Sequence, residues 1–182
     1  MHWPRASTRS ATRAARTRAA KILDSLVSVA QLPADFDRWD EVLALIMRAF
    51  AAMDGVIDPP SSAHRLTVEN LRDKARQETG FAALKDGRIV GCVFVLERAR
   101  DFYVGKLAVE PDFRGQGIAR RLMQAVEDLA RNRGKPAIEL QTRIELTGNH
   151  AAFARLGFHE TARTAHSGYD RPTSITMRKV LS

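Results

Sequence analysis

The residues that point most clearly to chemistry form a short loop, Arg114-Gly115-Gln116-Gly117-Ile118-Ala119. An apolar strand pattern precedes this loop, and apolar residues at helical spacing follow it at once, so the loop should open a helix. Free N–H groups and the helix dipole at such a position favour an anion. The two glycines let a phosphate approach the backbone, and Arg114 adds a positive charge with several donors. The loop therefore predicts a phosphate-binding site.

Two widespread phosphate-binding motifs do not fit the loop. A dinucleotide fingerprint needs a third glycine where Arg120 stands, and no repeated βαβ pattern precedes the loop. A Walker loop needs Gly-Lys-Ser/Thr, which the loop lacks. An ordinary strand-to-helix turn stays open as an alternative, because a hexapeptide alone matches often by chance.

A second block, Asn149-His-Ala-Ala-Phe-Ala-Arg-Leu-Gly-Phe158, follows after one further strand pattern. Phe153 and Leu156 form the apolar side of a short helix, and Gly157 ends it. Asn149 is placed to open this helix, since asparagine caps helices well.

Together the two blocks resemble the GNAT family of acetyl-CoA-dependent N-acetyltransferases, and the resemblance covers residues 25–182. In that family the loop amides hold the CoA pyrophosphate, and the asparagine of the second block contacts the pantetheine arm. The resemblance implies acetyl-CoA as co-substrate and no metal. It implies a cofactor site made of Leu107, Ala108, Val109, Arg114, Gly115, Gln116, Gly117, Ile118, Ala119, Asn149 and Phe153.

The resemblance also implies that an amine attacks the thioester directly in a ternary complex, with oxyanion donors from the backbone of residues 107–109. Many family members place a proton-donating tyrosine where this chain has Phe153. The nearest replacements are Tyr103 and His150, our candidate catalytic residues, with Glu97 and Asp101 as further acids near Tyr103. Each has a plain structural alternative: a half-buried strand aromatic, a surface residue of a first helical turn, or a solvated rim charge.

In GNAT proteins the connection before the last strand faces the acceptor, and here it reads His166 to Ser174. With the Pro59-Pro60 loop and its Asp54, it supplies our candidate substrate-binding residues, Asp58, His64, His166 and Tyr169. Their acidic members would suit a cationic acceptor. We expect an N-acetyltransferase for a primary amine of a small molecule or peptide. The alternative is a GNAT-fold acyl-CoA-binding protein with little or no turnover.

The elements that must position these residues predict an α/β (α+β) fold, in which a mixed sheet of about seven strands is flanked by about four helices. An apolar stripe over 36–53 predicts one helix, and Thr67 caps another that runs to Thr79. Asp86-Gly87 predicts a hairpin turn. The expected strands are 26–31, 81–85, 88–96, 102–109, 137–142, 158–162 and 174–180, an order that matches the GNAT topology.

The composition fits one globular domain, with 182 residues, 45% hydrophobic and 27% charged. The single cysteine, Cys92, lies in an apolar run, which favours a buried side chain and a reducing, cytoplasmic setting. The five histidines are too scattered for a metal site, and no apolar run reaches the length of a membrane span. The acceptor and the oligomeric state do not follow from the sequence, and a homodimer stays open.

The net charge of +8 comes mainly from the N-terminus. Residues 1–21 hold six basic residues and no acid, which leaves 23 basic against 21 acidic residues, or +2, for the rest. We expect residues 1–24 to be a basic, flexible extension and residues 25–182 to be the domain. A transit peptide, a nucleic-acid-binding arm and a start codon placed too far upstream stay open. Nucleic acid is not the expected partner, because the domain itself is nearly neutral.

Overall fold

The computed structural model describes residues 27–182 as one seven-stranded sheet in the order β1-β2-β3-β4-β5-β7-β6. The predicted extension over 1–24 and the predicted strand start at Leu26 lie outside the described residues. All neighbouring strands are antiparallel except β4 and β5. The strands are β1 (Ser28–Gln31), β2 (Thr79–Lys85), β3 (Arg88–Glu97), β4 (Phe102–Val109), β5 (Ala137–Arg143), β6 (His159–Thr164) and β7 (Ser174–Val180).

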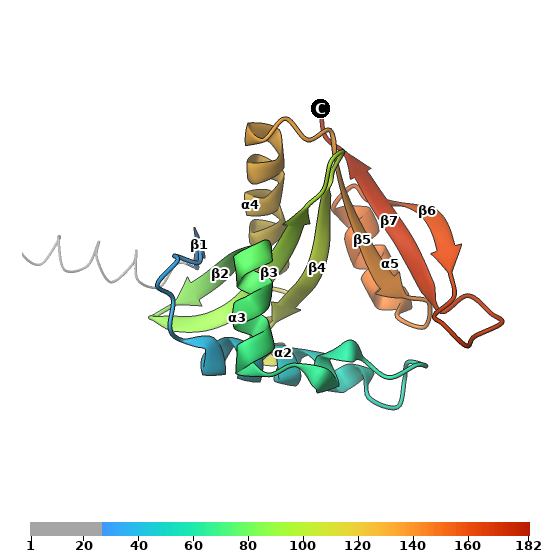
Figure 1. Cartoon of the computed structure of the whole chain (residues 1–182), viewed down its shortest axis with the longest axis horizontal. Coiled ribbons are helices and arrows are strands. Elements are labelled where there is room, and N and C mark those ends of the chain that lie inside the picture. Colours follow the sequence, from blue (N-terminus) through green and yellow to red (C-terminus); the bar gives the residue numbers. More distant parts are fainter. Residues whose placement is uncertain (1–26) are drawn as a thin grey trace, which may run out of the picture.

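The α-helices of the described chain are α2 (Trp39–Phe50), α3 (Val68–Gln77), α4 (Ile118–Asn132) and α5 (Thr147–Arg155). Helices α2 and α3 pack with Cys92 and Phe94 on one face of the sheet, whereas α4 packs on the other face with Val93 and Val95. Alternating strand residues thus serve two cores, because successive side chains point to opposite faces. The predicted fold class is confirmed, and Figure 1 shows this arrangement.

Local signals in the sequence explain most element boundaries. Thr67 and Asn70 form the capping box that begins α3, although the helix ends at Gln77, before the predicted Thr79. Asp86 and Gly87 both have positive φ, as the predicted two-residue turn between β2 and β3 requires. No helix of the described residues is both long and apolar enough to cross a bilayer.

Two predicted helix starts are wrong. Helix α2 begins at Trp39, since Phe36 lies before the helix and packs edge-on against Trp39 at 4.9 Å between ring centroids. The last apolar residue of the predicted stripe, Met53, lies outside α2 in a separate 3-10 turn. Helix α5 begins at Thr147, so Asn149 does not cap it but lies in its first turn. The apolar period continues beyond a helix whenever neighbouring loop residues also face the core.

Strands β4 and β5 pair over only three residues each, from Phe102 to Val104 on β4 and from Ile138 to Leu140 on β5. Beyond Val104 the pairing register of β4 with β3 shifts, which leaves Gly105 as a bulge. The two strands meet at one end and diverge toward the other, as Figure 1 shows. The backbone of residues 105–109 therefore has no β5 partner.

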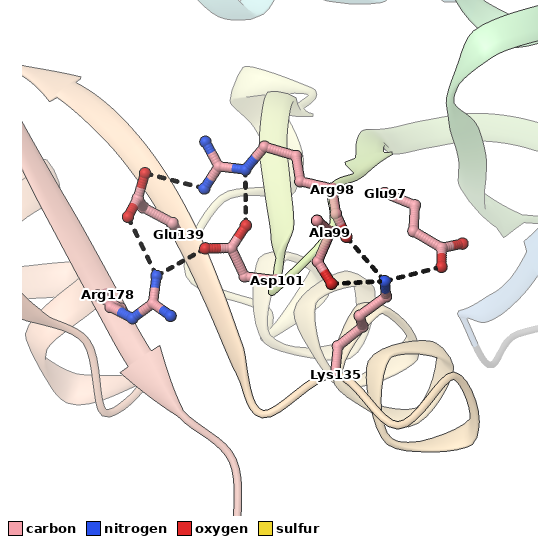
Figure 2. A network of polar contacts seen from close by, with 7 residues as sticks. All are labelled: Glu97, Arg98, Ala99, Asp101, Lys135, Glu139 and Arg178. Atoms are coloured by element: carbon pink, nitrogen blue, oxygen red, sulfur yellow. Dashed lines mark hydrogen bonds and ion pairs between the residues drawn. The ribbon is translucent and has the colours of Figure 1, made fainter.

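An ion-pair network around the buried Asp101 holds the paired end of β4 and β5 together. Arg98 donates to Asp101 at 2.6 Å and to Glu139 at 3.0 Å, and Arg178 donates to the same two carboxylates at 2.7 and 3.2 Å. Figure 2 shows the two guanidinium groups alternating with the two carboxylates. Because these residues come from β5, β7 and the β3–β4 connection, the network joins the two halves of the sheet.

We predict that Asp101→Asn lowers the free energy of unfolding by about 1–3 kcal/mol, since it leaves the half-buried guanidinium groups of Arg98 and Arg178 without a charged acceptor at this position. Burial alone would raise the pKa of Asp101, but hydrogen bonds from Arg98 and Arg178 hold it below its usual value. Its contribution is thus fully present above an unfolded pKa of about 3.9 and is lost as pH falls through the folded pKa.

Urea denaturation at pH 7 and below pH 4 measures this effect, and the wild-type and variant stabilities should converge in acid. The control is Asp128→Asn, which changes an exposed carboxylate on α4. Equal effects of the two substitutions would contradict the prediction.

Candidate functional site

The predicted loop lies between β4 and α4, and the buried residue Glu110 fixes its position at the end of β4. Glu110 is buried and receives hydrogen bonds from Arg48 at 2.5 Å and from Arg88 at 3.3 Å. These bonds, with the Arg48 bond the larger influence, lower the pKa of Glu110 despite its burial. Gly115 and Gly117 have φ of 76° and 77°, the left-handed region that glycine adopts readily. Gly117 is the N-cap of α4, so the predicted helix start is confirmed.

Two side chains of the loop do not point as an anion site would need. Arg114 donates to the Ala49 carbonyl at the end of α2, at 2.7 Å. Gln116 turns back and donates to the Asp112 carbonyl at 3.3 Å. The Ile118 side chain is buried in the core. The loop therefore presents mainly backbone N–H groups.

A groove of about 730 Å³ opens above this loop, between α4 and α5. We call it the α4 groove. Its charged lining is mostly basic, and its one lining carboxylate, Glu127, receives a hydrogen bond from Lys179 at 2.5 Å. The lining consists of Val109, Phe113, Arg114, Gly115, Gly117, Ile118, Ala119, Arg120, Gln124, Glu127, Ala152, Arg155, Leu156, Gly157 and Lys179.

A second cavity of about 390 Å³ lies where β4 and β5 diverge. We call it the splay cleft. Strand β4 gives Leu107 to the splay cleft and Val109 to the α4 groove, whereas Ala108 is buried against the α2 side of the core. Helix α5 also serves both cavities. The unpaired edge of β4 thus lies between the two.

The candidate catalytic residue Tyr103 and the predicted cofactor-site residue Phe153, which stands where many family members have a tyrosine, both line the splay cleft. Phe153 is half-buried and packs edge-on against Phe158 at 6.0 Å between centroids. Tyr103 lies under the Arg98 guanidinium, 5.1 Å from its ring centroid. Burial raises the pKa of Tyr103, with Glu139 and Glu78 adding to the effect against Arg98. The Tyr103 hydroxyl is therefore protonated at neutral pH.

The other candidates for proton transfer have structural partners. His150 Nε2 donates to the Arg143 carbonyl at 2.8 Å, which ties α5 to β5, and His150 is not among the lining residues. Asp101 belongs to the network of Figure 2. Glu97 lies 3.1 Å from Lys135.

Asn149, which the family resemblance predicts to contact the pantetheine arm, lines the splay cleft.

Of the four predicted substrate-binding residues, one lines the splay cleft and three lie outside its lining. Tyr169 donates to Asp58 at 2.5 Å and Arg171 donates to it at 3.0 Å, so the Pro59-Pro60 loop and the β6–β7 connection do meet. Only His166 of the predicted four lines the splay cleft. His64 instead faces Asp54 at 2.7 Å, outside the lining.

The charge of the splay cleft differs from the sequence-based expectation. No carboxylate is among its lining residues, whereas Arg65, Lys106 and Arg143 are. The sequence analysis did not include these three residues among the candidate site residues, because a lone cation in an apolar strand or at a loop end resembles an ordinary surface charge. Lys106 carried the clearest signal, since it interrupts the apolar pattern of β4.

Cys92 is fully buried, and burial raises its pKa to about 12, so it is a core residue as predicted and not a nucleophile. Within residues 27–182, no three His, Cys, Asp or Glu side chains gather where they could hold a metal.

Comparison with known proteins agrees with this geometry. Residues 39–158 match the model of the acetyltransferase (GNAT) family. The chain is 32% identical over 130 residues to an IAA acetyltransferase of Azospirillum brasilense, covering 70% of this chain and 82% of that protein. It is 36% identical over 86 residues to N-alpha-acetyltransferase 30 of Schizosaccharomyces pombe, covering 44% of this chain but only 57% of that protein.

The fold is also similar to that of the PaiA N-acetyltransferase of Thermoplasma acidophilum, a structure solved in complex with coenzyme A. The TM-score is 0.72 at 12% identity, over 86% of this chain and 99% of the other. The chain therefore belongs to the acetyltransferase (GNAT) family, which confirms the family and the acyltransferase class predicted from its two motifs.

Proposed function

We propose that this protein transfers an acetyl group from acetyl-CoA to a primary amine by direct attack in a ternary complex. The observation that carries the proposal is the pair of cavities beside the unpaired edge of β4. The α4 groove offers N–H groups and basic side chains for the phosphates of CoA. The splay cleft is the place for the acceptor.

The pantetheine arm would lie along β4. Where β5 diverges, the backbone groups of residues 105–109 on that edge lack strand partners. Buried backbone groups need partners, and the amides of pantetheine can supply them. This placement directs the thioester toward Leu107, Asn149 and Phe153 in the splay cleft.

The chemistry then needs few side chains. A neutral amine attacks the thioester carbonyl, the C–N bond forms, and a backbone N–H near Leu107 stabilises the oxyanion. The C–S bond breaks, the ammonium loses a proton to solvent or a base, and the thiolate takes a proton. Tyr103 is the protonated hydroxyl in the cleft that can give it.

The acyl-CoA-binding alternative depended on Phe153, which has no proton to give. A separate acceptor cleft beside that residue favours turnover. Relatives named as acetyltransferases, one of them an N-alpha-acetyltransferase, also favour an amine acceptor.

We predict that Gly117→Val lowers acetyl-CoA affinity at least tenfold, because a side chain would stand where the phosphates approach. Gly134→Val is the matched control: both glycines have positive φ, both leave a Cβ free of contacts, and Gly134 lies beyond the far end of α4. Both variants should lose about 1–2 kcal/mol of stability from the strained backbone. Calorimetry with acetyl-CoA, beside thermal unfolding, separates the two effects. Equal affinities would remove the loop from the binding site.

We predict that Tyr103→Phe lowers kcat by about 10²-fold or more while KM for acetyl-CoA stays unchanged, as expected for a general acid. Phe153→Tyr should raise kcat, because the ring already faces the cleft and gains a hydroxyl. The measurement is release of CoA thiol from acetyl-CoA with a panel of primary amines. If neither substitution changes kcat, neither ring faces the leaving sulfur, and if no amine is acetylated the proposed function fails.

A further inference from the structure

The splay cleft has a strongly basic lining. Arg65, Lys106 and Arg143 reach it from the loop after α2, from β4 and from β5. The fourth basic residue, His166, is neutral: Arg143 Nη1 can only donate, so His166 Nε2 accepts its bond at 3.1 Å and Nδ1–H donates to Thr173 Oγ1 at 2.6 Å. The lining thus carries a formal charge of +3.

Three carboxylates lie near the cleft without lining it, and each accepts a hydrogen bond, although Glu78 Oε2 and Glu145 Oε2 are buried without a partner. Glu78 accepts a hydrogen bond from Lys74 at 2.5 Å, and Asp58 accepts from Tyr169 and Arg171. Glu145 accepts from the Asp58 backbone N–H at 3.4 Å and lies 4.0 Å from Arg171. Throughout the described chain, no carboxylate lies within 4.0 Å of the three lining cations.

Lys106 shows this lack of a counter-ion most clearly. It is half-buried beside the Gly105 bulge, and its ammonium donates to Ser62 Oγ at 3.1 Å. Burial and the nearby Lys74 lower its pKa, with Glu78 opposing them. An anion in the cleft would favour the charged form of Lys106.

The lining also contains polar atoms without partners. Thr142 Oγ1 and Arg143 Nε are both buried, and neither has a hydrogen-bond partner among the described residues. Both belong to β5, at the end that has diverged from β4. Buried polar atoms without partners are uncommon in native proteins, so the hydrogen bonding at this end of β5 is incomplete.

We propose that the splay cleft binds the acceptor through an oxyanion, so that the substrate is a small primary amine that also carries a carboxylate or a similar anionic group. The proposal rests on the proposed acetyl transfer and names its substrate class. A cleft of about 390 Å³ is at the small end of ligand sites, which span roughly 300–1,000 Å³. The same positive charge lowers the pKa of a bound ammonium and so favours the neutral, attacking amine.

The test compares matched acceptors at pH 8. Each ω-amino acid with two to six carbons is paired with its own primary amide, and an aminoalkyl sulfonate and phosphonate distinguish the type of oxyanion. Diamines and a short peptide amide with a free N-terminus represent cationic and peptide acceptors. At the best chain length, kcat/KM for an anionic acceptor should exceed that for its neutral partner by about a hundredfold, the value of two charge-assisted hydrogen bonds.

Two variants test the residues. Lys106→Met and Arg65→Met should each reduce the ratio of anionic to neutral kcat/KM by about tenfold, mainly through KM for the acceptor. Lys106→Arg should restore most of it. Arg65 is exposed and its guanidinium has no partner in the described residues, so its replacement does not endanger the fold. The control is Arg163→Met, which removes an exposed charge on β6 outside both cavities and should leave the ratio unchanged.

A preference for the amides, the diamines or the peptide overturns this proposal and leaves acetyl transfer standing. If no amine is acetylated, the proposed acetyl transfer fails, and the anion site is then tested separately. Calorimetry measures the affinity of each acid and its amide for the CoA-loaded protein, and equal affinities overturn the proposed anion site.

Discussion

The short pairing of β4 with β5 is the constraint on which the rest of the structure depends. Three residues of each strand pair, and the pairing does not continue past the Gly105 bulge. Because so few backbone hydrogen bonds join β4 to β5, the two halves of the sheet need further contacts at the paired end. The Arg98–Asp101–Arg178–Glu139 network supplies it by joining β5, β7 and the β3–β4 connection. Closure at one end therefore permits opening at the other.

The opening creates functional groups without any special side chain. The backbone N–H and C=O groups of residues 105–109 that face away from β3 have no strand partner and become available to a ligand. The same divergence makes room for α5, which lines both cavities. The loop before α4 adds a further set of free N–H groups, and the buried Glu110 with its two arginines keeps that loop at the end of β4. Most of the proposed acetyl-CoA site is thus backbone.

Because the site relies on backbone, side chains are free to determine the acceptor. The α4 groove and the splay cleft are both basic, but for different reasons. In the groove, Glu127 already accepts a hydrogen bond from Lys179, which leaves arginines at the rim for phosphates. In the cleft, three cations belong to the lining and none of them forms an ion pair with a carboxylate of the described chain, so water or an anion must offset their repulsion.

The sequence by itself determined the family, the order of the elements, the loop before α4 and the burial of Cys92. These features depend on local signals: glycines beside a helix start, a two-residue turn, and apolar periods of two or 3.6 residues. It located Phe153 and Tyr103 at the cleft through their positions in these elements.

Only the tertiary structure decided which charges meet. The Asp54 and His64 side chains pair with each other, Asp58 is taken by Tyr169 and Arg171, and His150 is held by a β5 carbonyl. The splay cleft brings together three cations, Arg65, Lys106 and Arg143, the first and last of which lie 78 positions apart in the sequence. A sequence shows how many charges a chain has, but the sign of a cavity depends on which of them lack a partner, and long-range packing alone sets that.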